Sequence, residues 1–153
     1  MNDMNALCDQ VRETAYAIHV YHGHGHLEKV YENALAHRLR KVGLEVEQQH
    51  PIKVFDEDGT LIGDYIADLV INGTLIIELK TAKAFAPEHE AQILGYLKST
   101  GLEHGLLINF GSYKFQIRKF ARSTDERHRG FTAIGSAVSA ILGFLVLKPQ
   151  SWF

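Results

Sequence analysis

Apolar residues follow two spacings along the chain, and the change between them predicts the order of the elements. Spacings of three to four residues predict three helices, over 5–21, about 26–42 and 87 to about 100. Shorter apolar or alternating runs predict five strands, over 44–55, 61–71, 75–80, 105–110 and 113–120. The order α-α-β-β-β-α-β-β predicts an α/β (α+β mixed) fold, with a mixed central sheet flanked by helices.

Two strands carry further positional signals. Asn72-Gly73 between residues 61–71 and 75–80 is typical of a hairpin turn. Both of these strands are apolar on both faces, so we expect layers of structure on both sides. Pro51 lacks a backbone N–H, so the strand over 44–55 should be an edge or irregular strand.

Three ionisable residues, Asp68, Glu78 and Lys80, interrupt the apolar runs of this hairpin. A charge in a buried strand is costly unless it is paired or binds a metal ion. A two-residue turn would place Asp68 and Glu78 on opposite faces of the sheet, because a shift of one residue reverses every side chain. A three-residue turn would place all three on one face.

We predict the three-residue turn, with residues 71–73 as the loop and Gly73 in a left-handed bulge. In this register Val70 pairs with Thr74, and Asp68 pairs with Ile76. The carboxylates would offer hard oxygen ligands that suit Mg²⁺ or Mn²⁺, and Lys80 would orient water or offset charge at phosphorus. A buried ion pair without chemistry is the alternative, and the pattern alone does not decide between them.

Composition adds limits on class and location. The 153 residues, 46% hydrophobic and 22% charged, fit one globular domain with its own core. Cys8 is the only cysteine, which excludes a disulfide framework within the chain and favours the cytoplasm, as does the polar N-terminus without a signal-peptide core.

The charge is small overall but uneven. The net charge of −2 argues against binding nucleic acid by bulk positive charge. Residues 1–109 carry a net charge of −7 and residues 110–153 carry +5. The basic third is either a phosphate-binding rim or simply a solvated surface.

The C-terminal part differs from the rest. We divide the chain into a domain over 1–122 and an extension over 123–153, in which residues 131–147 hold no charge. This apolar segment is expected to pack on the domain or on a second subunit. A membrane helix, for which its length is the lower limit, and a poorly ordered tail are less favoured.

Several motifs carry a family resemblance. Asp68, followed by Glu78-Leu79-Lys80, resembles the signature of the PD-(D/E)XK nuclease superfamily, although Ile66-Ala67 stands where that signature has a proline. Gly25-His26-Leu27-Glu28-Lys29-Val30-Tyr31 resembles the pattern that names the GxxExxY protein family. Segments VYENAL, IADLVING, IIELK, HEAQILGYLK and GLLINFG are similar to that family too, over roughly residues 7–120.

The resemblance implies a restriction-endonuclease-like core and a metal-dependent nuclease. It implies a helix carboxylate, Glu28, at the metal site, although Glu28 is otherwise explained as a charge favoured near a helix N-terminus. The Gln92–Tyr96 spacing resembles a motif of the exonuclease branch of the superfamily, whereas spacing alone indicates an exposed Gln above a half-buried Tyr. The implied catalytic set is Glu28, Asp68, Glu78, Lys80 and Gln92, with Mg²⁺ or Mn²⁺ held by Asp68, Glu78 and Glu28.

The remaining expectations concern partners. Lys83, Tyr96, Lys114 and Arg118 are candidate nucleic-acid contacts, because Lys114 and Arg118 would share one face of the last strand. We expect hydrolysis of phosphodiester bonds of DNA or RNA, with DNA favoured over RNA as the partner. The alternative is a non-catalytic nucleic-acid-binding module, or an assembly role through residues 131–147. Four histidines between 19 and 26 favour a polar glycine-rich loop over a zinc site.

Overall fold

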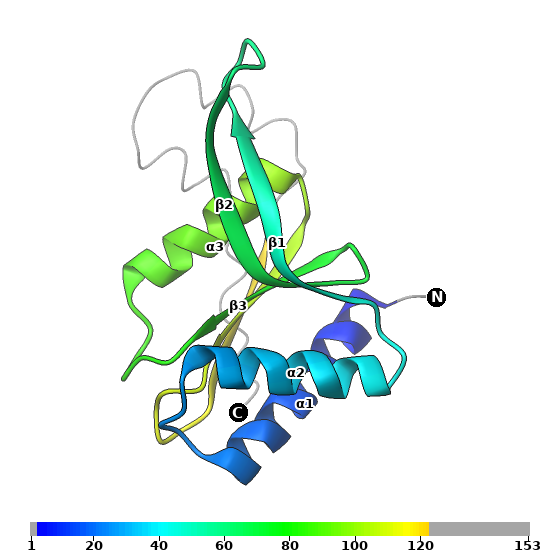
Figure 1. Ribbon diagram of the computed structural model, residues 1–153, viewed down its shortest axis with the longest axis vertical. Coiled ribbons are helices and arrows are strands. Elements are labelled where there is room, and N and C mark those ends of the chain that lie inside the picture. Colours follow the sequence, from blue (N-terminus) through cyan, green and yellow to red (C-terminus); the bar gives the residue numbers. More distant parts are fainter. Residues whose placement is uncertain (1–2, 123–153) are drawn as a thin grey trace.

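The computed structural model describes residues 3–122, and it confirms the predicted order of elements (Figure 1). The predicted extension over 123–153, including its apolar segment, lies outside the described residues. The elements are α1 (Met4–His22), α2 (Glu28–Lys41), β1 (Val46–Phe55), β2 (Leu61–Ile71), β3 (Leu75–Lys80), α3 (Pro87–Thr100), β4 (His104–Asn109) and β5 (Gln116–Ala121).

The five strands form one mixed sheet in the order β1-β2-β3-β4-β5. Neighbouring strands are antiparallel except for β3 and β4, which run parallel. A parallel pair needs a crossover connection, and α3 provides it. This mixed α+β architecture with a helix-flanked sheet is the fold class that the apolar spacing predicts.

Helices cover both faces of the sheet, as the doubly apolar strands predict. On one face α1 and α2 pack on β3 and β4 through a buried cluster that includes Ile18, Leu35 and Ile77. On the other face α3 packs through a second cluster that includes Ile76 and Ile93. The centre of the sheet is therefore closed to solvent on both sides, and a charge placed there needs compensation.

The β2–β3 turn has the expected odd length but not the expected residues. Val70 pairs with Ile76 and Ile71 pairs with Leu75, so the predicted pairing of Val70 with Thr74 is wrong by two residues. Asn72 and Gly73 both adopt positive φ values, 51° and 65°, and the Thr74 N–H donates to the Ile71 carbonyl at 3.0 Å. Thr74 is the extra residue that makes the loop odd, which keeps Asp68 and Glu78 on one face.

Strand β1 lies at an edge of the sheet, as Pro51 predicts. It is also irregular, because Gln49 has a left-handed φ of 55°. Figure 1 shows the β1–β2 hairpin extending beyond the rest of the sheet, and large apolar side chains at its far end, among them Phe55 and Ile62, are exposed. The part of this hairpin that is covered by helices is the part that holds Asp68.

The last strand is shorter than expected. Residues 113–115 lie in the loop before β5, which begins at Gln116. This loop starts at Gly111, where an added Cβ would lie 2.3 Å from the Thr81 carbonyl carbon. The chain can pass the segment after β3 this closely only without a side chain.

No helix among residues 3–122 is long and apolar enough to cross a membrane.

Candidate active site

Two buried carboxyl groups meet where β2 and β3 are covered by helices. Asp68 and Glu78 are 9% and 3% exposed. The Asp68 Oδ2 atom accepts a hydrogen bond of 2.8 Å from the Leu79 backbone N–H, which fixes Asp68 against β3. Glu78 Oε2 is buried and has no hydrogen-bond partner within the described chain. A buried oxygen without a hydrogen bond destabilises the folded protein. A ligand that binds this oxygen would therefore remove that destabilisation.

The electrostatics of the pair are those of crowded carboxyl groups. Burial, and then the neighbouring Asp68 carboxylate, raise the pKa of Glu78 to about 10. Burial also raises the pKa of Glu28, and the Asp68 charge adds to this effect. Glu78 therefore holds a proton at neutral pH, and a cation beside the two carboxyl groups would favour its release.

Lys80 is oriented from the opposite side by α3. The Lys80 Nζ donates to Gln92 Oε1 at 2.7 Å, and Gln92 Nε2 donates to the Tyr96 hydroxyl at 2.9 Å. The Tyr96 hydroxyl in turn donates to the Ile66 carbonyl at 3.1 Å. Burial raises the pKa of Tyr96 to about 12, so this hydroxyl keeps its proton and the chain of hydrogen bonds keeps one direction.

A cavity of about 380 Å³ opens beside Lys80, between the β2–β3 hairpin and the start of α3. It is large enough for a small polar ligand and brings solvent to the lysine. Its walls are formed by Tyr65, Lys80, Glu88, His89, Gln92 and Tyr96.

Glu28 is the first residue of α2 and is half-buried, and its pKa is raised first by this burial and then by the Asp68 charge. The expected set of three direct metal ligands is not preassembled, however. Within residues 3–122 no three acidic, histidine or cysteine side chains are placed together to hold a metal ion. Repulsion among three carboxylates opposes such an arrangement. Asp68 and Glu78 fit a hard divalent ion, because they supply two carboxyl groups and one unsatisfied buried oxygen.

Two further residues, Glu32 and Gln49, belong to the site but were not predicted. Glu32 lies one turn after Glu28 and is 2% exposed. Its carboxylate accepts hydrogen bonds from Lys29 Nζ at 2.6 Å, Gln48 Nε2 at 2.6 Å and Gln49 Nε2 at 2.5 Å. Gln49 Nε2 also lies 3.5 Å from Asp68 Oδ1, so it bridges the two carboxylates. The spacing of four between Glu28 and Glu32 was the signal that could have found Glu32.

The predicted nucleic-acid contacts are only partly supported by their positions. Lys83 is exposed, beyond the end of β3. Tyr96 is 3% exposed, so it supports Gln92 instead of offering a surface contact. Arg118 forms an ion pair with Glu90 and lies over the Phe85 ring, 4.9 Å from its centre.

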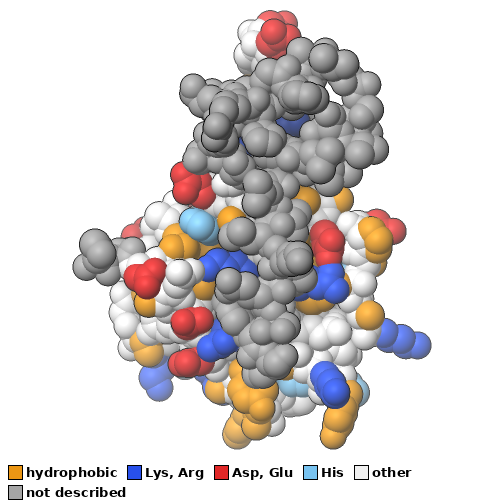
Figure 2. Space-filling model, turned by 180° about the vertical axis from the view of Figure 1, so that it is seen from behind, with side chains coloured by type: hydrophobic (Ala, Val, Ile, Leu, Met, Phe, Trp, Pro, Cys, Tyr) orange, Lys and Arg blue, Asp and Glu red, His pale blue; other side chains and the backbone are white. Residues whose placement is uncertain are grey.

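The expected basic stripe on the last strand is wrong, because Lys114 precedes β5 and Arg118 is neutralised by Glu90. Figure 2 shows Lys and Arg side chains interspersed with Asp and Glu where described residues are visible in that view. Acidic partners fixed nearby cancel the field that a row of basic residues would produce.

The sequence matches the protein-family model described as the PD-(D/E)XK nuclease superfamily over residues 5–120. The chain therefore belongs to this superfamily, whose nucleases generally use divalent metal ions and act on nucleic acids.

A crystal structure of the protein SSO0001 has a similar fold, with a TM-score of 0.51 and 18% sequence identity. The match covers 74% of this chain and 57% of that chain, so this chain spans little more than half of that relative's length. A search of curated protein sequences found no match.

Proposed function

We propose that the protein is a metal-dependent nuclease that hydrolyses phosphodiester bonds of DNA. The observation that carries the proposal is the buried Asp68–Glu78 pair, whose unsatisfied Glu78 oxygen lies on the strand that also bears the oriented Lys80. A buried ion pair would not explain it, because the Lys80 ammonium bonds to Gln92 and leaves Glu78 Oε2 without a partner.

The roles follow from these positions. Asp68 and Glu78 would hold Mg²⁺ or Mn²⁺, with Glu28 as an assisting carboxylate. When bound, the ion would stabilise negative charge at the phosphate and lower the pKa of water. Lys80, held by Gln92, positions the attacking water and offsets negative charge as a new P–O bond forms and the P–O bond to the leaving nucleotide breaks. Tyr96 and the Glu32–Gln49 bridge position Gln92 and Asp68.

Finer assignments rest on sequence motifs. We place the chain in the GxxExxY branch, because Gly25, Glu28 and Tyr31 keep the spacing that names it. Tyr31 explains one of these positions: its hydroxyl donates to the Gly23 carbonyl at 2.6 Å and accepts from the His26 N–H at 3.2 Å. These bonds fix the loop that delivers Glu28 as the first residue of α2. A buried, unpaired Cys8 supports a cytoplasmic location.

Purified protein should cleave DNA when Mg²⁺ or Mn²⁺ is present and stop when the metal is chelated. Glu78→Gln and Lys80→Met should each lower the cleavage rate by roughly 100-fold or more, which is the usual effect of removing one stabilising group. Matched controls are Glu57→Gln and Lys98→Met, exposed residues of the same types.

Two results discriminate the alternatives. If calorimetry shows Mg²⁺ binding that Asp68→Ala abolishes, but no nucleic acid is cut, the protein is a binding module that keeps the metal site. If all four variants cleave as the wild type does, the assigned residues are wrong.

A further inference from the structure

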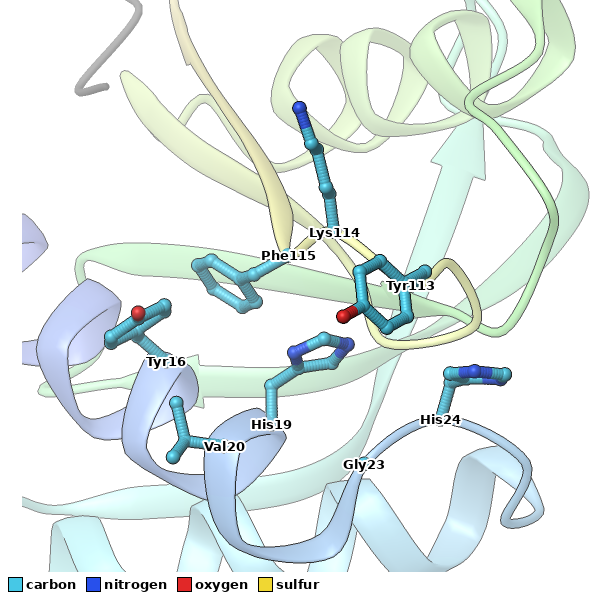
Figure 3. A pocket seen from close by; sticks show the side chains of 8 residues that line it. All are labelled: Tyr16, His19, Val20, Gly23, His24, Tyr113, Lys114 and Phe115. Carbon is cyan, nitrogen blue, oxygen red and sulfur yellow. The ribbon is translucent and has the colours of Figure 1, made fainter.

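A second cavity, of about 550 Å³, lies away from the carboxyl groups, between the end of α1 and the loop before β5. Figure 3 shows aromatic side chains from both segments around it, with Tyr16 and His19 on α1 facing Tyr113 and Phe115 on the loop. The proposed cleavage chemistry uses none of these residues. A cavity of this size is within the usual range for small-ligand sites, about 300–1,000 Å³.

The inner wall of this aromatic pocket is fixed. The Phe115 ring packs edge-on to Tyr16 with ring centres 5.7 Å apart, and its centre is 5.8 Å from that of the His19 ring. The His19 Nε2 atom forms a hydrogen bond of 2.9 Å with the Ser112 carbonyl, which joins α1 to the loop. A flat ligand would therefore enter a preformed slot and order few side chains on binding.

The outer rim is exposed and combines aromatic rings with a positive charge. Tyr113 is 85% exposed, and its ring lies edge-on to His24 with centres 6.4 Å apart. Lys114 extends away from the rings toward the outside of the pocket (Figure 3). Aromatic faces bind the flat face of any nucleobase, while a lysine at the rim binds a backbone phosphate. The set of side chains matches a nucleotide better than it matches a purely apolar ligand.

The pocket is joined to the candidate active site by one short loop. Gly23 and His24 line the pocket, and the same loop ends at Glu28. Tyr31 anchors this loop at both Gly23 and His26, so the distance between pocket and Glu28 is set by hydrogen bonds. A strand with a base in the pocket would pass along the loop toward the carboxyl groups.

We propose that the aromatic pocket binds one unstacked nucleobase, and that the substrate is therefore single-stranded or frayed DNA in preference to intact duplex. The inference rests on the proposed nuclease function and adds the substrate class. A base inside a duplex is paired and stacked, so its faces cannot reach Tyr113 unless the strand is unpaired or the base is extruded.

The test compares binding of a fluorescently labelled single strand with binding of the same strand annealed to its complement. Both are measured by fluorescence anisotropy in full-length protein carrying Lys80→Met, so that cleavage is slow during the measurement. We expect tighter binding of the single strand. Adding Tyr113→Ala should weaken single-strand binding roughly ten-fold, in keeping with the loss of one stacked base, and leave duplex binding unchanged.

Tyr21→Ala is the matched control, because Tyr21 is 79% exposed on α1 and does not line the pocket. A strand with one 2-aminopurine should lose fluorescence on binding, and Tyr113→Ala should restore it, which a purely electrostatic contact would not do. Lys114→Met should reduce the slope of the logarithm of single-strand affinity against the logarithm of salt concentration by about one, because about one counterion fewer is released.

Three outcomes would overturn the proposal. In the first, the Tyr113→Ala and Tyr21→Ala proteins bind the single strand with equal affinity. If the protein with native Lys80 still shows cleavage that depends on Glu78, only the proposed substrate class is then wrong. In the second, the dependence on Tyr113 emerges only when the chain ends at Arg122, which would identify the chain's own C-terminal segment as the occupant. In the third, neither DNA form is bound or cut, which would reject the nuclease function as well.

Discussion

Glu78 combines an acidic side chain with an environment that disfavours its charge. Burial and the Asp68 carboxylate raise its pKa to about 10, whereas in the unfolded chain the group titrates near 4.5. The folded protein thus holds a proton that the unfolded chain releases above about pH 5. The stabilising effect of that proton is complete below the unfolded pKa and is lost as pH rises toward the folded value.

Glu78→Gln should therefore stabilise the metal-free protein more as the pH rises, because glutamine has no proton to lose. Thermal melting in the presence of a chelator should show nearly equal melting temperatures for variant and wild type at about pH 5. At about pH 9 the variant should melt higher, by on the order of 10 °C or more. Glu57→Gln, at an exposed turn, is the control, and a pH-independent difference for Glu78→Gln would refute the assigned pKa.

The contacts of Glu32 and Gln49 are hard to recognise from the sequence alone. Glu32 looks like one more helical carboxylate, and only its three donors explain its burial. Gln49 lies beside Asp68, because its neighbours Gln48 and His50 pair with Leu69 and Ala67, and its own backbone adopts φ of 55°. A positive φ at a non-glycine residue leaves no local signal in the sequence, and Pro51 indicated only that the strand would be irregular.

At the scale of elements, the segment after β3 is held by the end of β4. Asn109 is fully buried; its Oδ1 accepts from the Ala82 and Gly111 N–H groups, at 3.0 and 2.9 Å, and its Nδ2 donates to the Ala82 carbonyl at 2.9 Å. The close passage of Gly111 beside Thr81 completes this clamp. The position of Lys80, one residue before Thr81, is thus set from two strands at once.

Gly111→Ala should break this clamp. The new Cβ would lie 2.3 Å from the Thr81 carbonyl carbon and 2.5 Å from the Ala82 nitrogen, and both are backbone atoms that cannot rotate away. We expect a loss of about 1–3 kcal/mol in the free energy of unfolding, measured with urea. Cleavage should fall further than the fraction of folded protein, because Lys80 moves with Thr81.

Gly95→Ala is the opposite control. Nothing lies within 4 Å of a Cβ added at Gly95, which is in the interior of α3. Alanine there should stabilise the protein by about 0.5–1 kcal/mol. If Gly111→Ala is as stable as this variant, the clamp does not determine the position of Lys80.

Much of the element pattern could be predicted from sequence, because it depends on local periodicity. The ends of α3 follow from Pro87 and Gly101, and its Gln92–Tyr96 pair follows from helical spacing. For the β2–β3 register, only the odd number of residues in the loop could be predicted from sequence. Which residue becomes the bulge depends on Asn72, whose N–H donates to the Glu45 carbonyl. The start of β5 was predicted three residues too early, because the alternation of polar and apolar residues continues through 113–115, which lie in the loop.

For the whole molecule, both hydrophobic clusters are built from residues between α1 and β5. The domain boundary after residue 122 remains a prediction, and it has a direct test. A chain ending at Arg122 should unfold in one cooperative transition and keep its metal-dependent cleavage, because both described clusters are formed by residues before this point. Calorimetry and a cleavage assay measure this, and aggregation or loss of the transition would place residues 123–153 inside the domain.

The same shortened chain tests the assembly role of residues 131–147. Light scattering gives the number of chains per particle for the shortened and the full-length protein. If that number is the same for both, the segment does not drive association.

The Asn109 clamp also has a consequence for the order of events during folding. It joins residues that are far apart in the chain and can form only after α3 has crossed over and β4 has paired with β3. Contacts of such long sequence separation close late, since the entropy of the intervening loop is lost first. We therefore expect Lys80 to reach its working position in the final stage of folding. In the proposed nuclease, a partly folded chain would therefore have no assembled hydrolytic centre.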